Sequence, residues 1–245
     1  MLELMQLGGM EKRRPSQLSG GQRQRVALAR SLVLKPKILL LDEPLASLDR
    51  KLRKEMQTEL KRIQREVGIT FLYVTHDQKV ALTISDTIAV MANGRLEQVG
   101  TPNEIYETPR TKLVADFMGA SNIFLGKVIA INSQEVQLET EDGLKIIATK
   151  SNDIRSEKIA GISVHPERIE VLPEGTDLEG DNKFRGKVVE MNYQGDFTET
   201  RISLNQVDRF ITVHLSNEPG QNARFSLGGG VLLCWSRHSS NILIG

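Results

Sequence analysis

Hydrophobic residues in the first half of the chain form short apolar runs separated by longer amphipathic segments. The unbroken aliphatic run from Ile38 to Leu41 follows a Lys35-Pro36 stop, which is typical of a strand buried on both faces of a parallel sheet. A helix is expected near Leu48 to Val67, and the β-branched and aromatic run from Ile69 to Val74 predicts a second strand. This alternation predicts an α/β fold.

The pattern that follows predicts a hairpin and two short helices. Thr87 to Met91 and Arg95 to Val99 have strand composition, and the Asn93-Gly94 pair between them is a strong hairpin signal. Thr101-Pro102 and Thr108-Pro109 each set a threonine N-cap before a proline at the first helical position. We therefore expect one helix to start at each of these two pairs.

From Ser121 onward the pattern changes to short strands and turns, which predicts an all-β domain. The segment Asn122 to Val128 aligns with Asn182 to Val188 at an offset of 60, and five of the seven positions are identical. Chance similarity between two strand openings is the alternative explanation. We interpret the repeat as two related β units in one small barrel.

The first candidate site lies in the segment Leu18 to Gln22. Ser19 stands where a helix N-cap belongs, and Gln22 three residues later completes a capping box. Because glycine costs roughly 1 kcal/mol against alanine inside a helix, Gly20 and Gly21 in the first turn indicate that the backbone approaches something closely. The free N–H groups and the helix dipole favour an anion such as phosphate. Taken alone, the segment also fits a glycine-rich loop before an ordinary helix.

Two adjacent carboxylates, Asp42 and Glu43, directly follow the first aliphatic run. Ligands of open α/β sheets bind at the carboxyl ends of the strands, so these acids are placed to meet Mg²⁺ and a nucleophilic water. The alternative is that they only cap the next turn.

Four segments, in this order and spacing, resemble the ATP-binding subunits of ABC transporters. They correspond to the signature motif, the Walker B strand, the D-loop and the switch-histidine segment of that family: Leu18 to Gln22, Ile38 to Glu43, Ser47 to Asp49, and Val74 to Asp77. The resemblance implies an α/β plus all-β chain, in which part of a P-loop-type nucleotide-binding domain precedes an OB-fold-like β-barrel.

The resemblance also implies roles for the signature residues in an ATPase that works as a head-to-tail dimer. Ser19, Gly20 and Gly21 would donate hydrogen bonds to the γ-phosphate of an ATP held by the partner subunit. Gln22 would either contact the nucleotide or serve only as the capping-box partner. Asp49 would relay the state of one site to the other, and it could also cap the helix that follows.

The remaining candidates would act on the metal and on the reacting water. By the resemblance, Asp42 would help to hold Mg²⁺ through water, and Glu43 would orient or deprotonate the attacking water. His76 would contact the γ-phosphate and sense its hydrolysis. A histidine at a strand end can also be an ordinary turn residue, but its place in the ordered set favours the functional role.

The family's phosphate loop, G-x-x-x-x-G-K-[ST], does not occur in these residues. Gly8 to Lys12 does not fit it, and Lys79 and Lys112 follow no glycine-rich turn between a strand and a helix. Met1 is therefore interpreted as an internal start, a truncation or the start of a partial gene. We expect the chain alone to be inactive as an ATPase, although its signature segment could complete the site of an intact partner.

The second half resembles the transport-associated OB (TOBE) region of ABC importers. Three motifs carry this likeness, namely Val164 to Ile169, Asn192 to Asp196 and Leu232 to Ser236. The two resemblances together imply a domain boundary: residues 1–119 would be the C-terminal part of the ATPase domain, and residues 120–245 a regulatory TOBE domain.

Composition narrows the class of partner. The formal net charge of +1 divides into 19 Lys and Arg against 14 Asp and Glu in residues 1–120, and 13 against 17 in residues 121–245. The basic residues of the first half are interleaved with acids, which is typical of a solvated helix face, and the β half is acidic with few aromatics. We therefore expect no nucleic-acid partner.

The single cysteine excludes an intramolecular disulfide, and no apolar run approaches the roughly 20 residues that span a bilayer.

The leading hypothesis is an energy-coupling subunit of an ABC import system that binds and hydrolyses ATP with Mg²⁺. Its partners would be a second ATPase subunit in a homodimer, transmembrane permease subunits and, indirectly, a substrate-binding protein. It would be cytoplasmic and bound through the permease to the inner face of the plasma membrane. The stretches Asn192 to Gly195 and Met118 to Phe124 look most like polyamine (spermidine and putrescine) importers, whereas sugar, iron, sulfate and thiamine importers share the architecture.

Two other classes of function are alternatives. A regulatory or dimerisation module built on residues 121–245, without autonomous ATPase activity, is suggested by an intact β half beside an incomplete ATPase half. A soluble ABC protein of DNA repair or translation is disfavoured by the TOBE-like second half.

Overall fold

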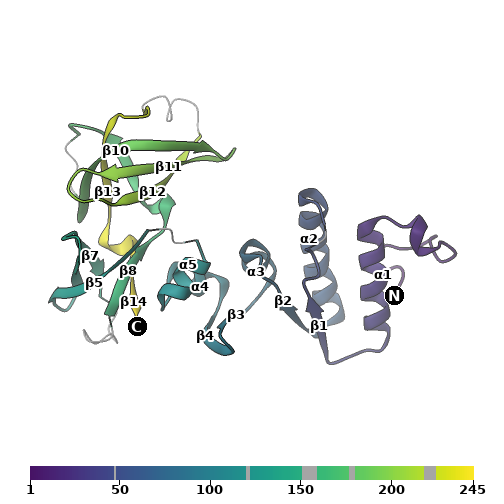
Figure 1. Cartoon of the computed structure of the whole chain (residues 1–245). Helices are drawn as coiled ribbons and strands as arrows, with labels where there is room; N and C mark the ends of the chain where they lie inside the picture. Colours follow the sequence, from purple (N-terminus) through teal and green to yellow (C-terminus); the bar gives the residue numbers. More distant parts are fainter. Residues whose placement is uncertain (47, 120–121, 151–158, 177–179, 218–224) are drawn as a thin grey trace. The chain divides into compact units, whose positions relative to one another are not determined.

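The elements of the chain fall into two units, Met1–Ile88 and Ala89–Gly245 (Figure 1). The computed structural model describes residues 1–245 except 47, 120–121, 151–158, 177–179 and 218–224. Each unit is described by itself. The predicted boundary between functional domains at residues 119 and 120 stays a prediction.

The first unit alternates helices with two strands, as the sequence pattern predicts. Its elements in chain order are η1 (Pro15–Gln17), α1 (Gly20–Val33), β1 (Ile38–Asp42), α2 (Arg50–Val67), β2 (Thr70–Val74) and α3 (Gln78–Ile84). β1 and β2 pair in parallel, with Leu40 opposite Leu72 and Asp42 opposite Val74. Because the strands are parallel and in this register, their carboxyl ends meet at one edge of the sheet.

The prediction that the first strand is buried on both faces is wrong. Leu39 is buried and packs with α1, α2 and α3, but Ile38 and Leu40 are 58% and 66% exposed. Leu72 and Val74 on β2 are likewise more than half exposed. The described helices cover one face of this two-stranded sheet, so alternate side chains of the aliphatic run face solvent.

The predicted hairpin is confirmed. β3 (Ile88–Ala92) and β4 (Arg95–Gly100) pair with each other. Asn93 and Gly94 have φ of +49° and +75°, the left-handed pair that a tight two-residue hairpin turn requires.

Of the two predicted helix starts that follow, one is confirmed and one is wrong. α4 (Pro102–Glu107) begins after Thr101, which accepts a hydrogen bond from the backbone of Glu104 in a capping box. α5 (Lys112–Phe117) is capped by Thr111 and not by Thr108. The backbone N–H of Thr108 still bonds to Glu104 in the last turn of α4, so Thr108 ends one helix and cannot open the next.

The rest of the second unit is all-β, as predicted. Its strands are β5 (Asn122–Ile131), β6 (Glu135–Thr140), β7 (Lys145–Thr149), β8 (Ile159–Val164), β9 (Glu170–Pro173), β10 (Asn182–Tyr193), β11 (Phe197–Leu204), β12 (Phe210–Ser216), β13 (Gly230–Trp235) and β14 (Ser240–Ile244), with the short helices η3 (Pro166–Arg168) and η5 (Arg237–Ser239). They form two curled five-stranded sheets, ordered β14-β8-β5-β6-β7 and β12-β11-β10-β13-β9. Side chains from both sheets share one hydrophobic core.

The internal repeat found in the sequence is confirmed as a structural repeat. β5 and β10 open the two halves, and the pairing of each with its next strand is interrupted by a bulge one repeat apart, after Val128 and after Val188. The final strands are exchanged: β9 follows β8 in the chain but pairs with β13, and β14 pairs with β8.

Two buried asparagines at equivalent positions join the halves. Asn122 donates to the carbonyl of Thr212 (2.7 Å) and accepts from its N–H (2.9 Å), while Asn182 does the same with Ile147 (3.0 and 2.8 Å). Thr212 and Ile147 lie on β12 and β7, the edge strands of the opposite sheets. Each asparagine therefore satisfies backbone groups that an edge strand would otherwise leave unpaired.

Across the described residues, every helix is too short or too polar to pass through a bilayer.

Candidate active site

The predicted helix start at Ser19 is confirmed in atomic detail. The Ser19 hydroxyl accepts from the N–H of Gln22 (3.2 Å), and the Gln22 side chain accepts from the N–H of Ser19 (2.9 Å). Gln22 is thus a capping-box partner, and a contact with nucleotide stays a prediction. The first turn of α1 presents the N–H groups of Gly20 and Gly21 at the positive end of the helix dipole.

The two glycines differ in what surrounds them. A Cβ at Gly21 would stand 3.0 Å from Cδ1 of Leu52, whereas a Cβ at Gly20 would have only Leu48 Cδ2 near it, at 3.9 Å. The close approach that the sequence predicts at this turn is therefore, at Gly21, a packing contact with α2. Gly20 is the glycine whose surroundings are open.

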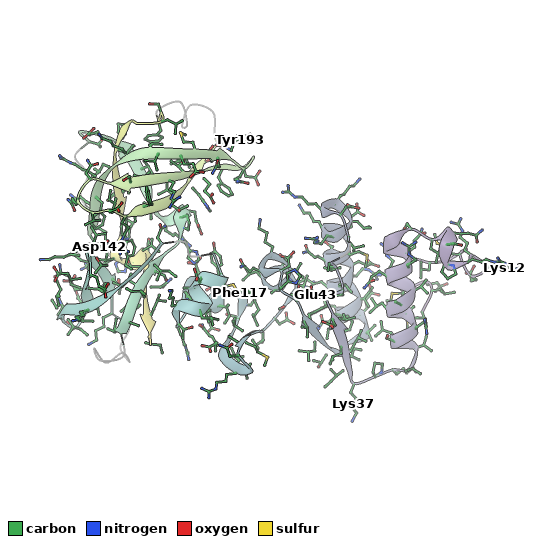
Figure 2. All side chains as sticks on the ribbon, viewed as in Figure 1. Lys12, Lys37, Glu43, Phe117, Asp142 and Tyr193 are labelled. Atoms are coloured by element: carbon green, nitrogen blue, oxygen red, sulfur yellow. The ribbon has the colours of Figure 1, made fainter. Side chains whose placement is uncertain are left out.

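Glu43, directly after β1 (Figure 2), is the centre of a cluster of hydrogen bonds. Its Oε1 lies 2.6 Å from Nδ1 of His76 and accepts from the His76 N–H at 2.9 Å. Its Oε2 accepts from the Thr75 hydroxyl at 3.2 Å. The structure thus brings together two of the predicted catalytic residues, Glu43 and His76, because the parallel strands β1 and β2 end side by side.

The environment of Glu43 keeps its carboxylate ionised. Partial burial raises its pKa, but hydrogen bonds from the His76 ring, the His76 N–H and the Thr75 hydroxyl outweigh this, and the pKa lies below the ordinary glutamate value. An ionised carboxylate only accepts hydrogen bonds, so Nδ1 of His76 carries the proton in this pair. The Nε2 edge belongs to a side chain that is 81% exposed.

Asp42, unlike the adjacent Glu43, lies outside the hydrogen-bonded cluster. It is exposed, and its carboxylate has no described hydrogen bond or ion pair. No group of three or more His, Cys, Asp or Glu side chains suited to a metal gathers within the described ranges. Mg²⁺ is commonly held by one or two carboxylates together with substrate phosphates and water, and a single free carboxylate at a strand end fits that mode.

Asp49 caps α2, as one of its two predicted roles requires. Its Oδ1 accepts from the N–H of Leu52 at 2.9 Å. The relay role stays a prediction, and Ser47, from the same predicted D-loop, lies outside the described residues.

Between Ser19–Gln22 and the Glu43–His76 pair, the described part of the chain shows no hydrogen bond or ion pair, so the candidates form two separate groups.

Sequence reasoning gave no role to Thr75. Its hydroxyl donates to Glu43 and accepts from the N–H of Asp77 at 3.1 Å, while Asp77 caps α3 by accepting from Val80 at 3.1 Å. The available signal was its place between Val74 and His76 in the quoted motif, directly after the end of β2.

Comparison with known families finds a match in each half of the chain. Residues 1–46 match the ABC transporter family, and residues 162–243 match the TOBE domain. The beginning of the chain is thus similar to ABC transporters and its later part to TOBE domains, in agreement with the predicted α/β plus all-β, OB-fold-like class.

Curated relatives match most or all of the chain. The spermidine/putrescine import ATP-binding protein PotA of Thermobifida fusca is 47% identical over 247 residues, covering 100% of this chain and 63% of the relative. The PotA protein of Rubrobacter xylanophilus is 45% identical over 99% of this chain and 63% of its own length. That of Pseudomonas aeruginosa is 44% identical over 91% and 61%. The chain therefore spans less than two thirds of the length of these relatives.

Proposed function

We propose that this chain is the signature-bearing and TOBE-bearing part of an ATP-hydrolysing subunit that drives import through a separate membrane permease. The observation that carries the proposal is the Glu43–His76 pair, an ionised carboxylate held at the joined ends of two parallel strands. The match of residues 1–46 to ABC transporters and the import function named for the relatives support it.

Glu43 acts on the attacking water in this proposal. A carboxylate offers about four acceptor positions. Three are occupied, two on Oε1 by His76 and one on Oε2 by Thr75. The remaining position on Oε2 can accept a hydrogen from one water, which orients that water and receives its proton as it attacks.

The other candidates bind or orient charge. Asp42, with its free carboxylate, would hold Mg²⁺. The exposed Nε2 of His76 would donate to the terminal phosphate when both ring nitrogens carry a proton. Bound Mg²⁺–ATP supplies the phosphoanhydride bond to be broken and neutralises part of the charge that develops on it. The N–H groups of Gly20 and Gly21, with Ser19, donate to the terminal phosphate of a nucleotide held mainly by a second subunit.

We further propose spermidine and putrescine as the imported substrates. The support is the name of the relatives, which match the TOBE half of this chain as well as the ATPase half. Sugar, iron, sulfate and thiamine importers are the alternatives that share the domain order. The permease subunits would place the protein on the inner face of the plasma membrane, with a second ATPase subunit beside it and a substrate-binding protein on the other side.

A regulatory or dimerisation role of residues 121–245 is a separate candidate. Its support is that the β strands bury a large hydrophobic core, which includes Phe124, Phe184 and Trp235. Such a unit can act on a partner without taking part in hydrolysis.

The ATPase proposal is tested by comparing this chain with an extended chain, in which the N-terminal segment of the Thermobifida fusca relative precedes residue 1. We expect no ATP turnover by this chain alone and measurable turnover by the extended chain. Glu43→Gln in the extended chain should lower turnover by about 10²- to 10⁴-fold, because it removes the general base.

Glu55→Gln is the matched control, since Glu55 is an exposed carboxylate on α2. It should leave turnover unchanged. Equal turnover by this chain and the extended chain, or full activity of the Glu43→Gln variant, would contradict the proposal.

A further inference from the structure

Arg53, in the first turns of α2, links two segments that border the candidate site. Its Nη1 donates to Oδ2 of Asp77 at 3.0 Å, and its Nη2 donates to the carbonyl of Leu48 at 3.1 Å. Both charged side chains are about one third exposed, at 34% and 29%. One guanidinium therefore ties the backbone just before α2 to the residue that caps α3.

The hydrogen bonds continue from Asp77 to the catalytic carboxylate. The Asp77 N–H donates to the Thr75 hydroxyl (3.1 Å), and that hydroxyl donates to Oε2 of Glu43 (3.2 Å). The Thr75 hydroxyl can take part in both hydrogen bonds, because a hydroxyl can donate one hydrogen bond and accept others. An unbroken series thus runs from Leu48 through Arg53, Asp77 and Thr75 to Glu43.

We propose that Arg53 is a positioning residue, which couples the Leu48–Asp49 segment to the orientation of the Glu43 carboxylate through Asp77 and Thr75. A planar guanidinium can hold two acceptors at a fixed separation. A displacement of the Leu48 carbonyl must therefore either break its bond to Arg53 or move Asp77 with it. The consequence for hydrolysis rests on the proposed function, but the coupling itself is a property of this chain.

The competing explanation is that Arg53 only stabilises the packing of α2 against α3. A packing role predicts a loss of folding stability with no specific change at Glu43. A positioning role predicts a change at Glu43 while the chain stays folded.

The test is nuclear magnetic resonance of this chain without nucleotide, for the wild type and Arg53→Gln. Two signals are followed, the chemical shift of the Glu43 carboxyl carbon at one fixed pH and the exchange rate of the Asp77 amide. In the variant we expect Asp77 amide exchange to be about 3- to 10-fold faster, as for the loss of one net hydrogen bond. The carboxyl carbon resonance of Glu43 should also shift, because the hydrogen bond from the Thr75 hydroxyl weakens.

Two further variants sharpen the result. Asp77→Asn keeps a side-chain oxygen that can cap α3 but removes the charge facing Arg53, and it should reproduce the Glu43 change. Lys54→Gln removes a positive charge from the next, exposed position of α2 and should change neither signal.

Arg53→Lys covers the case in which the glutamine variant fails to fold. Lysine keeps the charge but has no rigid fork to hold both acceptors, so we expect a smaller change of the same kind at Glu43. A Glu43 carboxyl resonance at its wild-type position in the folded Arg53→Gln or Arg53→Lys chain would overturn the proposal. Because no nucleotide is present, that outcome would leave the proposed ATPase function standing.

Discussion

Glu43 has a backbone φ of +44°, in a conformational region that residues other than glycine rarely adopt. Its N–H nevertheless bonds to Val74 at 2.9 Å, which continues the pairing of β1 with β2 past the last strand residue. The left-handed turn comes directly after Asp42 and separates the environments of the two adjacent acids. Such conformations gather at functional sites, where surrounding hydrogen bonds hold them.

The first prediction concerns the titration of Glu43. Because its pKa is lowered in the folded chain, its hydrogen bonds contribute their full stability above the ordinary glutamate pKa of about 4.3. This contribution is lost as the pH falls through the lower, folded pKa. His76→Ala removes the ring donor, so the pKa of Glu43 measured by carboxyl carbon resonance should rise. The same substitution at His238 is the control, and an unchanged Glu43 titration in His76→Ala would contradict the assignment.

At the scale of single residues, the sequence predicted Glu43 and His76 as separate candidates at strand ends, but it did not predict their hydrogen bond. The part played by Thr75 and the positive φ of Glu43 were not predicted either, because neither hydrogen-bond direction nor a strained turn leaves a mark on the pattern of polar and apolar positions.

At the scale of elements, local sequence signals located helix starts correctly where the capping residue belongs to one helix alone. Ser19 and Thr101 cap helices as their capping boxes predict. The predicted helix start at Thr108-Pro109 was wrong because the N–H of Thr108 bonds to the carbonyl of Glu104 and so ends the preceding helix. Burial of β1 on both faces was wrong for a different reason, since the number of layers on a sheet is not a local property.

The second prediction separates the two glycines of the α1 start. Gly21→Ala places a Cβ at 3.0 Å from Leu52, and Gly20→Ala meets only Leu48, at 3.9 Å. We expect Gly21→Ala to be less stable than Gly20→Ala by about 1 kcal/mol, the lower end of the cost of overpacking. Urea unfolding followed by the helical circular dichroism signal measures this difference. Equal stability of the two variants would show that Leu52 does not require a glycine there.

At the scale of the whole molecule, the repeat in the second unit was predictable and the exchange of strands was not. Asn122 and Asn182 begin matching segments in the sequence, and they begin matching strands in the structure. The apolar pattern identifies strands but does not say which strands pair, so nothing in it showed that β9 and β14 lie in opposite sheets.

The third prediction tests the repeat through these two asparagines. Asn122→Ala and Asn182→Ala each leave a backbone N–H and a carbonyl of an edge strand without their partner. Each should lower the free energy of unfolding by about 2 to 3 kcal/mol, and the two losses should be similar. The fluorescence of Trp235, the single tryptophan and a buried member of this core, reports the unfolding of this unit.

Asn192→Ala is the control for the asparagine pair, because Asn192 is exposed and the described hydrogen bond of its side chain goes to the side chain of Glu190. It should change the free energy of unfolding by no more than about 0.5 kcal/mol. A large loss for one buried asparagine and none for the other would contradict the equivalence of the two halves.

The central claim is that Glu43 of one subunit and Gly20 of another serve the same ATP, and mixing two inactive variants tests it most directly. In the extended chain, Glu43→Gln removes the base, and Gly20→Asp sets a negative charge against the terminal phosphate while placing an acid favourably in the first turn of α1. Each variant alone should be inactive, whereas an equimolar mixture should recover about a quarter of the unsubstituted turnover, since random pairing gives mixed dimers with one complete site. A mixture as inactive as its components would contradict the claim.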